Sequence, residues 1–256
     1  MIVSDAELAA GVAEIAREAG AAIMAIYAKD FDVEVKADAS PVTQADQDAE
    51  RIILAGLATL TPDVPVVAEE EVAAGRVPDI AGGQFWLVDP LDGTREFINR
   101  NGEFTVNIAL IRSGAPVLGA VYIPALEEMF LAAGPANVTR IRADGKPQPV
   151  SARTAPADGL DAMVSRSHLS PETEEFLDGY SIRERKDAGS SLKFCRLAEG
   201  AADLYPRLGR TMEWDTAAGH AVLACAGGSV CQLDGKPLTY GKPGFENPHF
   251  VARGRH

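Results

Sequence analysis

Two carboxylates, Asp89 and Asp92, lie three residues apart at the end of the apolar run 85–88. The run predicts a short buried strand, and Pro90 stiffens the backbone that follows it. Mg²⁺ binds carboxylate and carbonyl oxygens, and the restricted φ of Pro90 helps to hold the Leu91 carbonyl in one direction between the two acids. The corner therefore suits a hard divalent cation, although a D-P-x-D-G turn also forms without any metal.

Further groups that suit such a site lie elsewhere in the chain. Gly93 and Thr94 follow the corner, where a loop that opens a helix can present N–H groups to an anion. The acidic run 69–71 follows a second strand-like run, 64–68, and Asp215 lies far downstream. Taken alone, Asp215 also fits the N-cap of a helix. Acids this far apart in the sequence can meet only through the fold.

Three separated motifs occur along the chain: the Glu69-Glu70 pair, WLVDPLDGT at 86–94 and WDTAAGHA at 214–221. Together they resemble the inositol monophosphatase superfamily of Mg²⁺-dependent, lithium-sensitive phosphatases. Within it, the chain is similar to the CysQ-type branch of 3'(2'),5'-bisphosphate nucleotidases, on SPVTQAD (40–46), RNGEFTVNIALI (100–111), SRSH (165–168), GSSLKFC (189–195) and LYPRLG (204–209). The resemblance implies an α/β (mixed α+β) fold, a layered αβαβα sandwich of the inositol monophosphatase and sugar phosphatase type.

The resemblance also implies a set of metal ligands. Glu69, Asp89 and the Leu91 carbonyl would hold one Mg²⁺, and Asp89, Asp92 and Asp215 would hold a second. A third, looser Mg²⁺ near Glu69 belongs to the same expectation.

The attacking group implied by the resemblance is a water molecule. Glu69 and Thr94 would orient this water, and Asp46 would support it. Considered by itself, Asp46 lies near the start of a predicted helix, where an acid also interacts favourably with the helix dipole. The substrate would in addition contact Leu91, Asp92, Gly93, Thr94 and Asp215.

A second group of residues would decide which substrate is taken. Ser190 and Lys193 lie where a Gly-Ser turn enters a helix, which suits a phosphate, and Arg207 on the next strand could supply a planar fork to the same phosphate. Ordinary surface charge is the alternative for Lys193 and Arg207. In the nucleotidase branch, the residue that matches His168 lies against the adenine ring.

The expected activity is hydrolysis of the 3'-phosphate of adenosine 3',5'-bisphosphate to AMP and phosphate. Ser190, Lys193 and Arg207 would hold the phosphate that is not cleaved. Two alternatives stay open within the superfamily, inositol monophosphatase and fructose 1,6-bisphosphatase activity. A third belongs to another class, a non-catalytic regulator that binds metal or nucleotide.

The elements that must position these groups follow from hydrophobic periodicity and turn residues. Helices are expected at 4–28, with a Ser4–Glu7 capping box, within 40–60 with Thr43 as N-cap, at 171–177 and at 215–226. The stretch 189–200 is expected to be a Gly-Ser-rich turn that feeds a helix. Strands are expected at 31–36, 64–68, 85–88, 104–111, 116–124, 128–133, 160–165, 181–186, 202–208 and 229–233. The turn-rich stretch 134–158 is the expected junction between an N-terminal α+β domain, 1–140, and a C-terminal α/β domain, 141–256.

Composition excludes several classes of protein. The 256 residues carry a formal net charge of −13, which disfavours binding to a nucleic acid polymer. Three cysteines imply no disulfide framework and fit a reducing cytosol, and neither a signal peptide nor a membrane-spanning run is expected. We expect a cytoplasmic protein with a small-molecule nucleotide substrate, as a monomer or homodimer. Peripheral association with an inner membrane is an added expectation from the resemblance.

Overall fold

The computed structural model describes residues 4–29, 33–35, 41–166 and 170–255. The helices are α1 (Asp5–Tyr27), α2 (Gln44–Leu60), α3 (Glu69–Ala73), α4 (Thr94–Ile98), α5 (Pro171–Asp178), α6 (Leu192–Ala198) and α7 (Ala217–Cys225), with short 3₁₀ turns at Pro124–Leu126 and Pro243–Phe245. Strands β1 (Val33–Val35) and β2 (Pro41–Thr43) form a small antiparallel pair.

The two larger sheets divide the remaining strands. The seven-stranded sheet has the order β3-β4-β5-β6-β7-β8-β9 and contains β3 (Val66–Ala68), β4 (Gln84–Asp92), β5 (Thr105–Arg112), β6 (Ala115–Ile123), β7 (Glu128–Ala133), β8 (Val138–Ile141) and β9 (Pro147–Pro149). The five-stranded sheet has the order β11-β10-β12-β14-β13 and contains β10 (Leu160–Ser165), β11 (Ile182–Ala188), β12 (Leu204–Arg207), β13 (Ser229–Gln232) and β14 (Phe250–Arg253).

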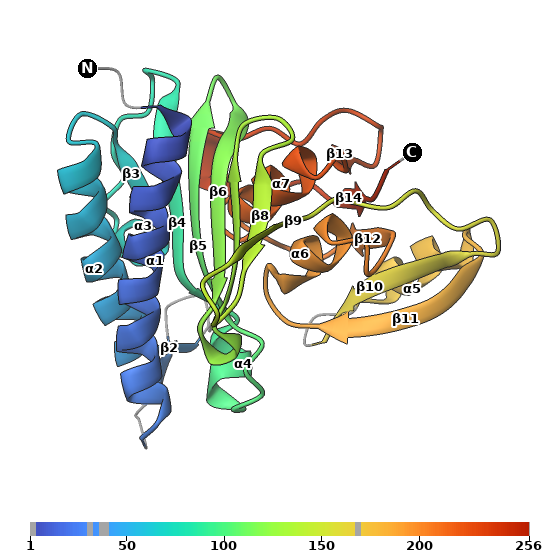
Figure 1. Ribbon diagram of the computed structural model, residues 1–256, viewed down its shortest axis with the longest axis horizontal. Coiled ribbons are helices and arrows are strands. Elements are labelled where there is room, and N and C mark those ends of the chain that lie inside the picture. Colours follow the sequence, from blue (N-terminus) through green and yellow to red (C-terminus); the bar gives the residue numbers. More distant parts are fainter. Residues whose placement is uncertain (1–3, 30–32, 36–40, 167–169, 256) are drawn as a thin grey trace.

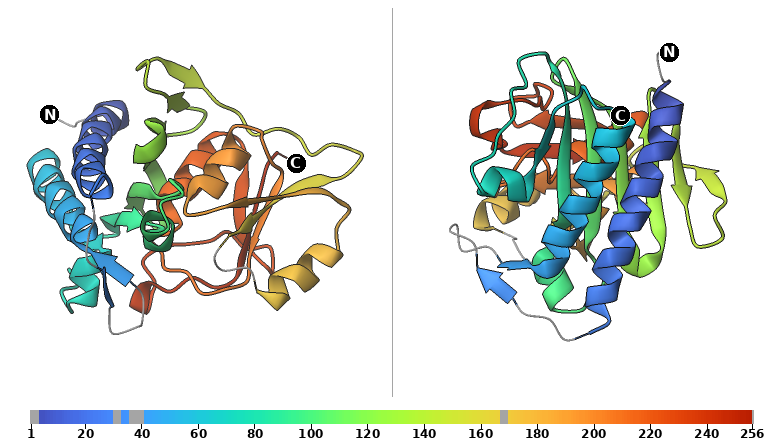
Figure 2. Two further views of the ribbon diagram at one scale, coloured as in Figure 1. Left: turned by 90° about the horizontal axis from the view of Figure 1, so that it is seen from below. Right: turned by 90° about the vertical axis from the view of Figure 1, so that its left-hand side faces the viewer.

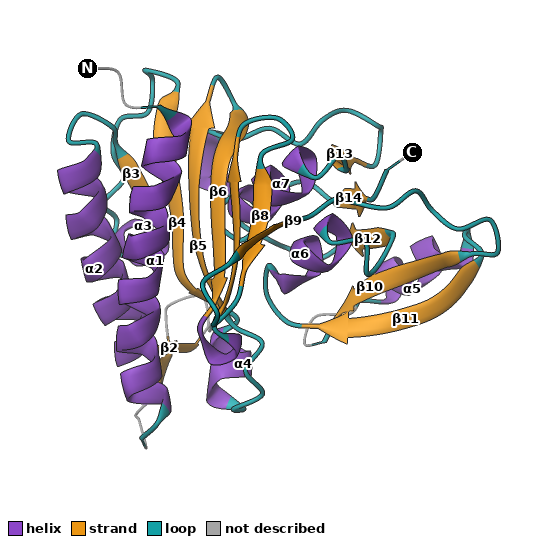
Figure 3. Cartoon of the chain, in the orientation of Figure 1, coloured by secondary structure: helices purple, strands orange, loops and turns teal. Residues whose placement is uncertain are grey.

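Helices and sheets alternate in layers across the molecule. Helices α1 and α2 cover one face of the seven-stranded sheet, and α6 and α7 lie between its other face and the five-stranded sheet (Figure 1; Figure 3). Helix α5 lies beyond the five-stranded sheet, and the view from below shows the same sequence of layers (Figure 2). The expected αβαβα sandwich is therefore confirmed.

Strand β4 shows why this layering follows from the sequence. Successive side chains of a strand point to opposite faces of the sheet. Trp86 and Val88 are buried in the core formed with α1 and α2, whereas Phe85 and Leu87 are buried in the core formed with α6 and α7. A strand covered on both faces reads as one continuous apolar run, which is what residues 85–88 show.

Most predicted elements are present. The Ser4–Glu7 capping box opens α1, and Thr43 caps α2. Of the strand expected at 31–36, only 33–35 lies within the described residues, and it is a strand there. Strand β4 continues to Asp92 instead of ending at residue 88, and the helix expected from Asp215 begins at Ala217.

Two other differences concern the second half of the chain. The stretch 134–158 contains β8 and β9, which extend the first sheet past residue 140. Strand β14 was not expected, although it lies in the middle of the second sheet beside β12 and β13. The division into domains at 140/141 stays a prediction. In the described part of the chain, none of the helices is both long and apolar enough to cross a bilayer.

Candidate active site

The predicted site residues gather around one cavity of about 1140 Å³. Its lining includes Glu69, Asp89, Leu91, Asp92, Gly93, Thr94, Ser190, Lys193, Arg207 and Asp215. Asp46 is not in the lining but lies directly behind Thr94, as described below. His168 lies outside the described residues. The structure brings together all the other predicted site residues.

Sheet register explains how the first three acids meet. Strand β3 runs parallel to β4, with Ala68 beside Val88. The next residues along the two strands are Glu69, which opens α3, and Asp89, so their carboxylates start from neighbouring positions. Asp92 lies at the end of β4, three residues further.

The fourth acid arrives from the other half of the chain. Asp215 lies in the turn before α7, and α7 packs against β5 and β6 of the seven-stranded sheet. Its Oδ2 accepts a hydrogen bond from the Met212 N–H at 2.8 Å, so the carboxylate closes that turn. Thr216, not Asp215, stands at the N-cap position of α7, and the simple N-cap interpretation of Asp215 is therefore wrong.

The corner of β4 is held by its own backbone and by neighbouring strands. Asp89 is buried, and its Oδ1 accepts the Leu91 N–H at 3.0 Å. Asp92 Oδ2 accepts from the Ser191 N–H at 2.6 Å and from Asn107 Nδ2 at 3.2 Å. Both carboxylates are thus fixed before any ligand arrives.

Electrostatics in this cluster favour a bound cation. Burial raises the pKa of Asp215, and the negative charges of Asp92 and Glu69 raise it further. Burial also raises the pKa of Asp92, against the attraction of Lys193. Carboxylates that disfavour one another's ionisation in a buried place are stabilised by a divalent cation between them.

The donor set fits magnesium. The four acids and the Leu91 carbonyl offer only oxygen, the ligand that Mg²⁺ prefers. Within the described ranges, no three His, Cys, Asp or Glu side chains are already drawn together as a closed metal cluster. The charges of Asp92 and Glu69 nevertheless act on Asp215, and the carboxylates of Asp92 and Asp215 each accept a hydrogen bond from a backbone N–H.

Asp46 caps helix α2 and also contacts Thr94. Its Oδ2 accepts from the N–H and the hydroxyl of Thr43 at 2.7 and 2.8 Å, which makes it the third residue of a capping box at the start of α2. Its Oδ1 lies 3.3 Å from Thr94 Oγ1, which is also 3.3 Å from the Leu91 carbonyl. Asp46 is thus a helix-capping acid that also accepts a hydrogen bond from the Thr94 hydroxyl.

Two cationic residues of the cavity lining, Lys193 and Arg207, are buried. Lys193 Nζ donates to the carbonyls of Ser190 and Ala188 at 2.7 and 3.2 Å and lies over the Tyr205 ring. Burial lowers the Lys193 pKa to about 8, although Asp92 acts in the opposite direction. Arg207 is only 9% exposed, and its buried Nε has no partner among the described residues. The alternative of ordinary surface charge is therefore wrong for both.

Sequence reasoning missed three residues that support the site. Glu50 is buried on α2, and its Oε2 accepts the Glu70 N–H at 2.9 Å. It thereby caps α3, because the N-cap residue of that helix, Ala68, has no side-chain acceptor. Burial raises the Glu50 pKa to about 7. Asn107 and Ser191 bind each other as well as Asp92. Only Asn107 gave a signal in the sequence, as a polar residue inside an apolar strand.

Fold and site together define a layered α/β protein with a cavity lined by the four acids and by the buried cationic side chains of Lys193 and Arg207. A family model described as the inositol monophosphatase family matches residues 4–253. The chain belongs to the inositol monophosphatase family.

Three known proteins show what this chain is similar to within the family. The "3'(2'),5'-bisphosphate nucleotidase CysQ" of Escherichia coli K12 is 50% identical over 251 residues, which cover 93% of this chain and 96% of that protein. The crystal structure of CysQ from Bacteroides thetaiotaomicron is 37% identical and superimposes with a TM-score of 0.83 over 97% of both chains. An inositol monophosphatase from Zymomonas mobilis is 27% identical, with a TM-score of 0.77 over 97% of this chain and 92% of that one.

Proposed function

We propose that the protein is a Mg²⁺-dependent 3'(2'),5'-bisphosphate nucleotidase that hydrolyses the 3'-phosphate of adenosine 3',5'-bisphosphate to AMP and phosphate. The observation that carries this proposal is one cavity whose lining combines a group of carboxylates with two buried cationic side chains. The names of the similar proteins support the nucleotide substrate. A cytoplasmic location, contact with an inner membrane and the monomeric or dimeric state stay predictions.

The residues would hold two Mg²⁺ ions: Glu69, Asp89 and the Leu91 carbonyl for one, and Asp89, Asp92 and Asp215 for the other. A third, looser ion near Glu69 is part of the proposal. When bound, these ions neutralise charge on the phosphate oxygens and make a water molecule more acidic.

The protein's own groups then orient the attacking water. Because Thr94 Oγ1 can donate its proton to Asp46, a lone pair of the hydroxyl is left to accept a hydrogen bond from that water. Glu69, which follows the neighbouring strand β3, accepts the second hydrogen bond. The water is thereby held with its own lone pair toward the phosphorus atom.

The phosphate that is not cleaved would bind to Lys193 and Arg207. Two of the three Lys193 ammonium protons point at backbone carbonyls and hold the Ser190 backbone in a left-handed conformation, with φ of 46°. The third proton and the unpaired Nε of Arg207 are donors for an anion. A second phosphate on the substrate is what would use them.

Substrate profiling tests the proposal. Purified protein with Mg²⁺ should release phosphate from adenosine 3',5'-bisphosphate much faster than from inositol 1-phosphate or fructose 1,6-bisphosphate, and EDTA should stop the reaction. Faster release from either of the other substrates would refute the branch assignment. Binding of metal and nucleotide without any turnover would favour the regulator.

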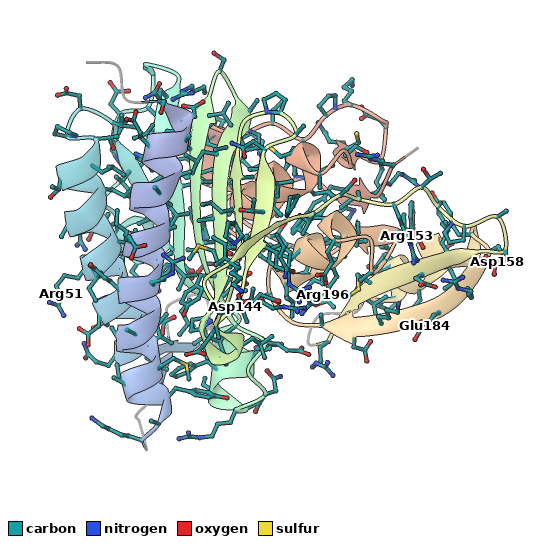
Figure 4. The ribbon with its side chains drawn as sticks, in the orientation of Figure 1. Arg51, Asp144, Arg153, Asp158, Glu184 and Arg196 are labelled. Carbon is teal, nitrogen blue, oxygen red and sulfur yellow. The ribbon has the colours of Figure 1, made fainter. Side chains whose placement is uncertain are left out.

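The variant Asp89→Asn tests the metal ligands separately. It keeps an oxygen that can accept the Leu91 N–H, so the corner should fold, and it should abolish turnover. Asp144→Asn is the matched control, because Asp144 Oδ1 accepts the Lys146 N–H at 3.1 Å in an exposed turn between β8 and β9 (Figure 4). Asp144 is not among the residues that line the cavity. Retained activity in Asp89→Asn would overturn the metal scheme.

A further inference from the structure

Ser191 makes three hydrogen bonds to three different parts of the chain. Its N–H donates to Asp92 Oδ2 at 2.6 Å, and its hydroxyl donates to the Asp215 carbonyl at 2.8 Å. The same hydroxyl oxygen accepts from Asn107 Nδ2 at 2.9 Å. One buried residue at the start of α6 is therefore bonded to the end of β4, to the middle of β5 and to the turn before α7.

The position of Ser191 separates it from substrate contact. Its neighbours Ser190 and Lys193 line the cavity, whereas Ser191 does not, and its side chain is only 1% exposed. It therefore cannot act on a ligand directly. It can act only through the residues that it holds.

Two of these residues are ligands of the same proposed cation. Asp92 and Asp215 come from different layers of the molecule and share no element, so their separation depends on what joins them. A hydrogen bond from a backbone N–H to a carboxylate is charge-assisted and stronger than one between neutral groups. The hydrogen bond from the Ser191 hydroxyl to the Asp215 carbonyl holds the main chain of Asp215 next to the same serine.

We propose that Ser191 is a positioning residue that sets the distance between Asp92 and Asp215 and thereby the affinity of the divalent-cation site that they share. This inference rests on the proposed function, because it uses the same metal ligands. Partners that orient metal ligands in this way commonly change metal affinity by about 10- to 100-fold when they are removed.

Removal of the hydroxyl cannot be absorbed nearby. In Ser191→Ala the N–H still reaches Asp92, but the Asp215 carbonyl and one Asn107 N–H lose their partner in a buried place. Asn107 Oδ1 already has no partner in the described structure, so after the loss this amide keeps only its hydrogen bond to Asp92. A shift of the turn that carries Asp215 is the expected relief.

Binding of Mn²⁺, which accepts the same oxygen ligands, measures the effect without turnover. Titration of the metal-free protein, with free Mn²⁺ followed by electron paramagnetic resonance, should show one site weakened about tenfold or more in Ser191→Ala. Ser191→Cys keeps the shape of the side chain, although sulfur is larger than oxygen, and has only a weak donor, so it should weaken the same site. A high Mg²⁺ concentration should restore most of kcat in both variants.

Ser170→Ala is the matched control. Ser170 is also a serine at the N-cap position of a short helix, α5, and its hydroxyl accepts the Thr173 N–H, but it lies outside the cavity lining. This variant should lose a similar amount of thermal stability and bind Mn²⁺ as the wild type does.

The outcomes separate this inference from the proposed function. Wild-type Mn²⁺ affinity in Ser191→Ala or Ser191→Cys would overturn the inference and leave the proposed function untouched. Mn²⁺ binding by the wild type without hydrolysis of the nucleotide would overturn the proposed function, and weakened binding in the two variants would then still support the role of Ser191. A wild type that binds no Mn²⁺ would overturn both.

Discussion

Replacement of Gly119 by alanine should destabilise the protein through α7. Gly119 lies on β6, where a Cβ atom would stand 2.6 Å from the Ala218 carbonyl oxygen and 2.7 Å from the Ala221 Cβ. Its φ is not positive, so the penalty is one of space and not of backbone conformation. A helix backbone and a methyl group have no rotamer to change, and α7 itself must move away from the sheet.

The size of the effect follows from this overpacking. Extra methyl groups in a well-packed core cost about 1–3 kcal/mol. For a chain of this size each kcal/mol lowers Tm by about 2–4 °C, so a decrease of roughly 2–12 °C is expected. Because α7 begins two residues after Asp215, the same movement should weaken Mn²⁺ binding.

Thermal unfolding in EDTA measures the first effect, and the Mn²⁺ titration measures the second. Gly82→Ala is the control, because a Cβ there would meet no atom within 4 Å and its φ is also not positive. It should leave Tm unchanged or slightly raised. A Gly119→Ala protein with the Tm of the wild type would refute the close packing of α7 on β6.

Three further outcomes are expected. Glu103 binds Arg166 through two hydrogen bonds of 2.9 Å and also accepts the N–H that opens the Gly-Ser turn, so steady-state kinetics of Glu103→Gln should show KM for the bisphosphate nucleotide rising more than kcat falls. Hydrogen bonds from Arg183 hold the pKa of Asp161 far below its usual range. The stability that this carboxylate gives is present above about pH 4 and is lost as the pH falls further. Thermal scans of Asp161→Asn should therefore show a shallower decline of Tm below pH 4. Mg²⁺ at 100 times its Kd should stabilise the wild type by about 2.7 kcal/mol over the EDTA-treated protein in calorimetry.

The carboxylates of the site were predictable because their signal is local. Each apolar strand ends in acids, and the parallel register of β3 and β4 sets Glu69 beside Asp89. The two long helices were equally accessible, since their periodicity and caps are encoded within a few turns. The role of Asp215 came only from the resemblance, because its hydrogen bond to Met212 gives no pattern in the sequence.

Elements with weak patterns were missed for a physical reason. The edge strand β9 is fully exposed and contains two prolines, so it has no alternation of buried and exposed side chains. The short strand β14 is buried throughout its first three residues, but four residues are too few to distinguish a strand from a loop. Both are held by pairing with strands distant in the sequence, which local propensity does not report.

The burial of Lys193 and Arg207 could not be predicted either, and it bears on how an anionic substrate is attracted. A protein with a net charge of −13 repels a bisphosphate at long range, but salt screens such fields over about 8 Å at physiological ionic strength. Inside the cavity the two cations are screened much less, because their side chains are removed from water. Local charge, and not the total, therefore decides binding. On this reasoning, added salt should raise the rate at which the nucleotide associates by reducing the long-range repulsion, whereas Arg207→Met should mainly speed its dissociation.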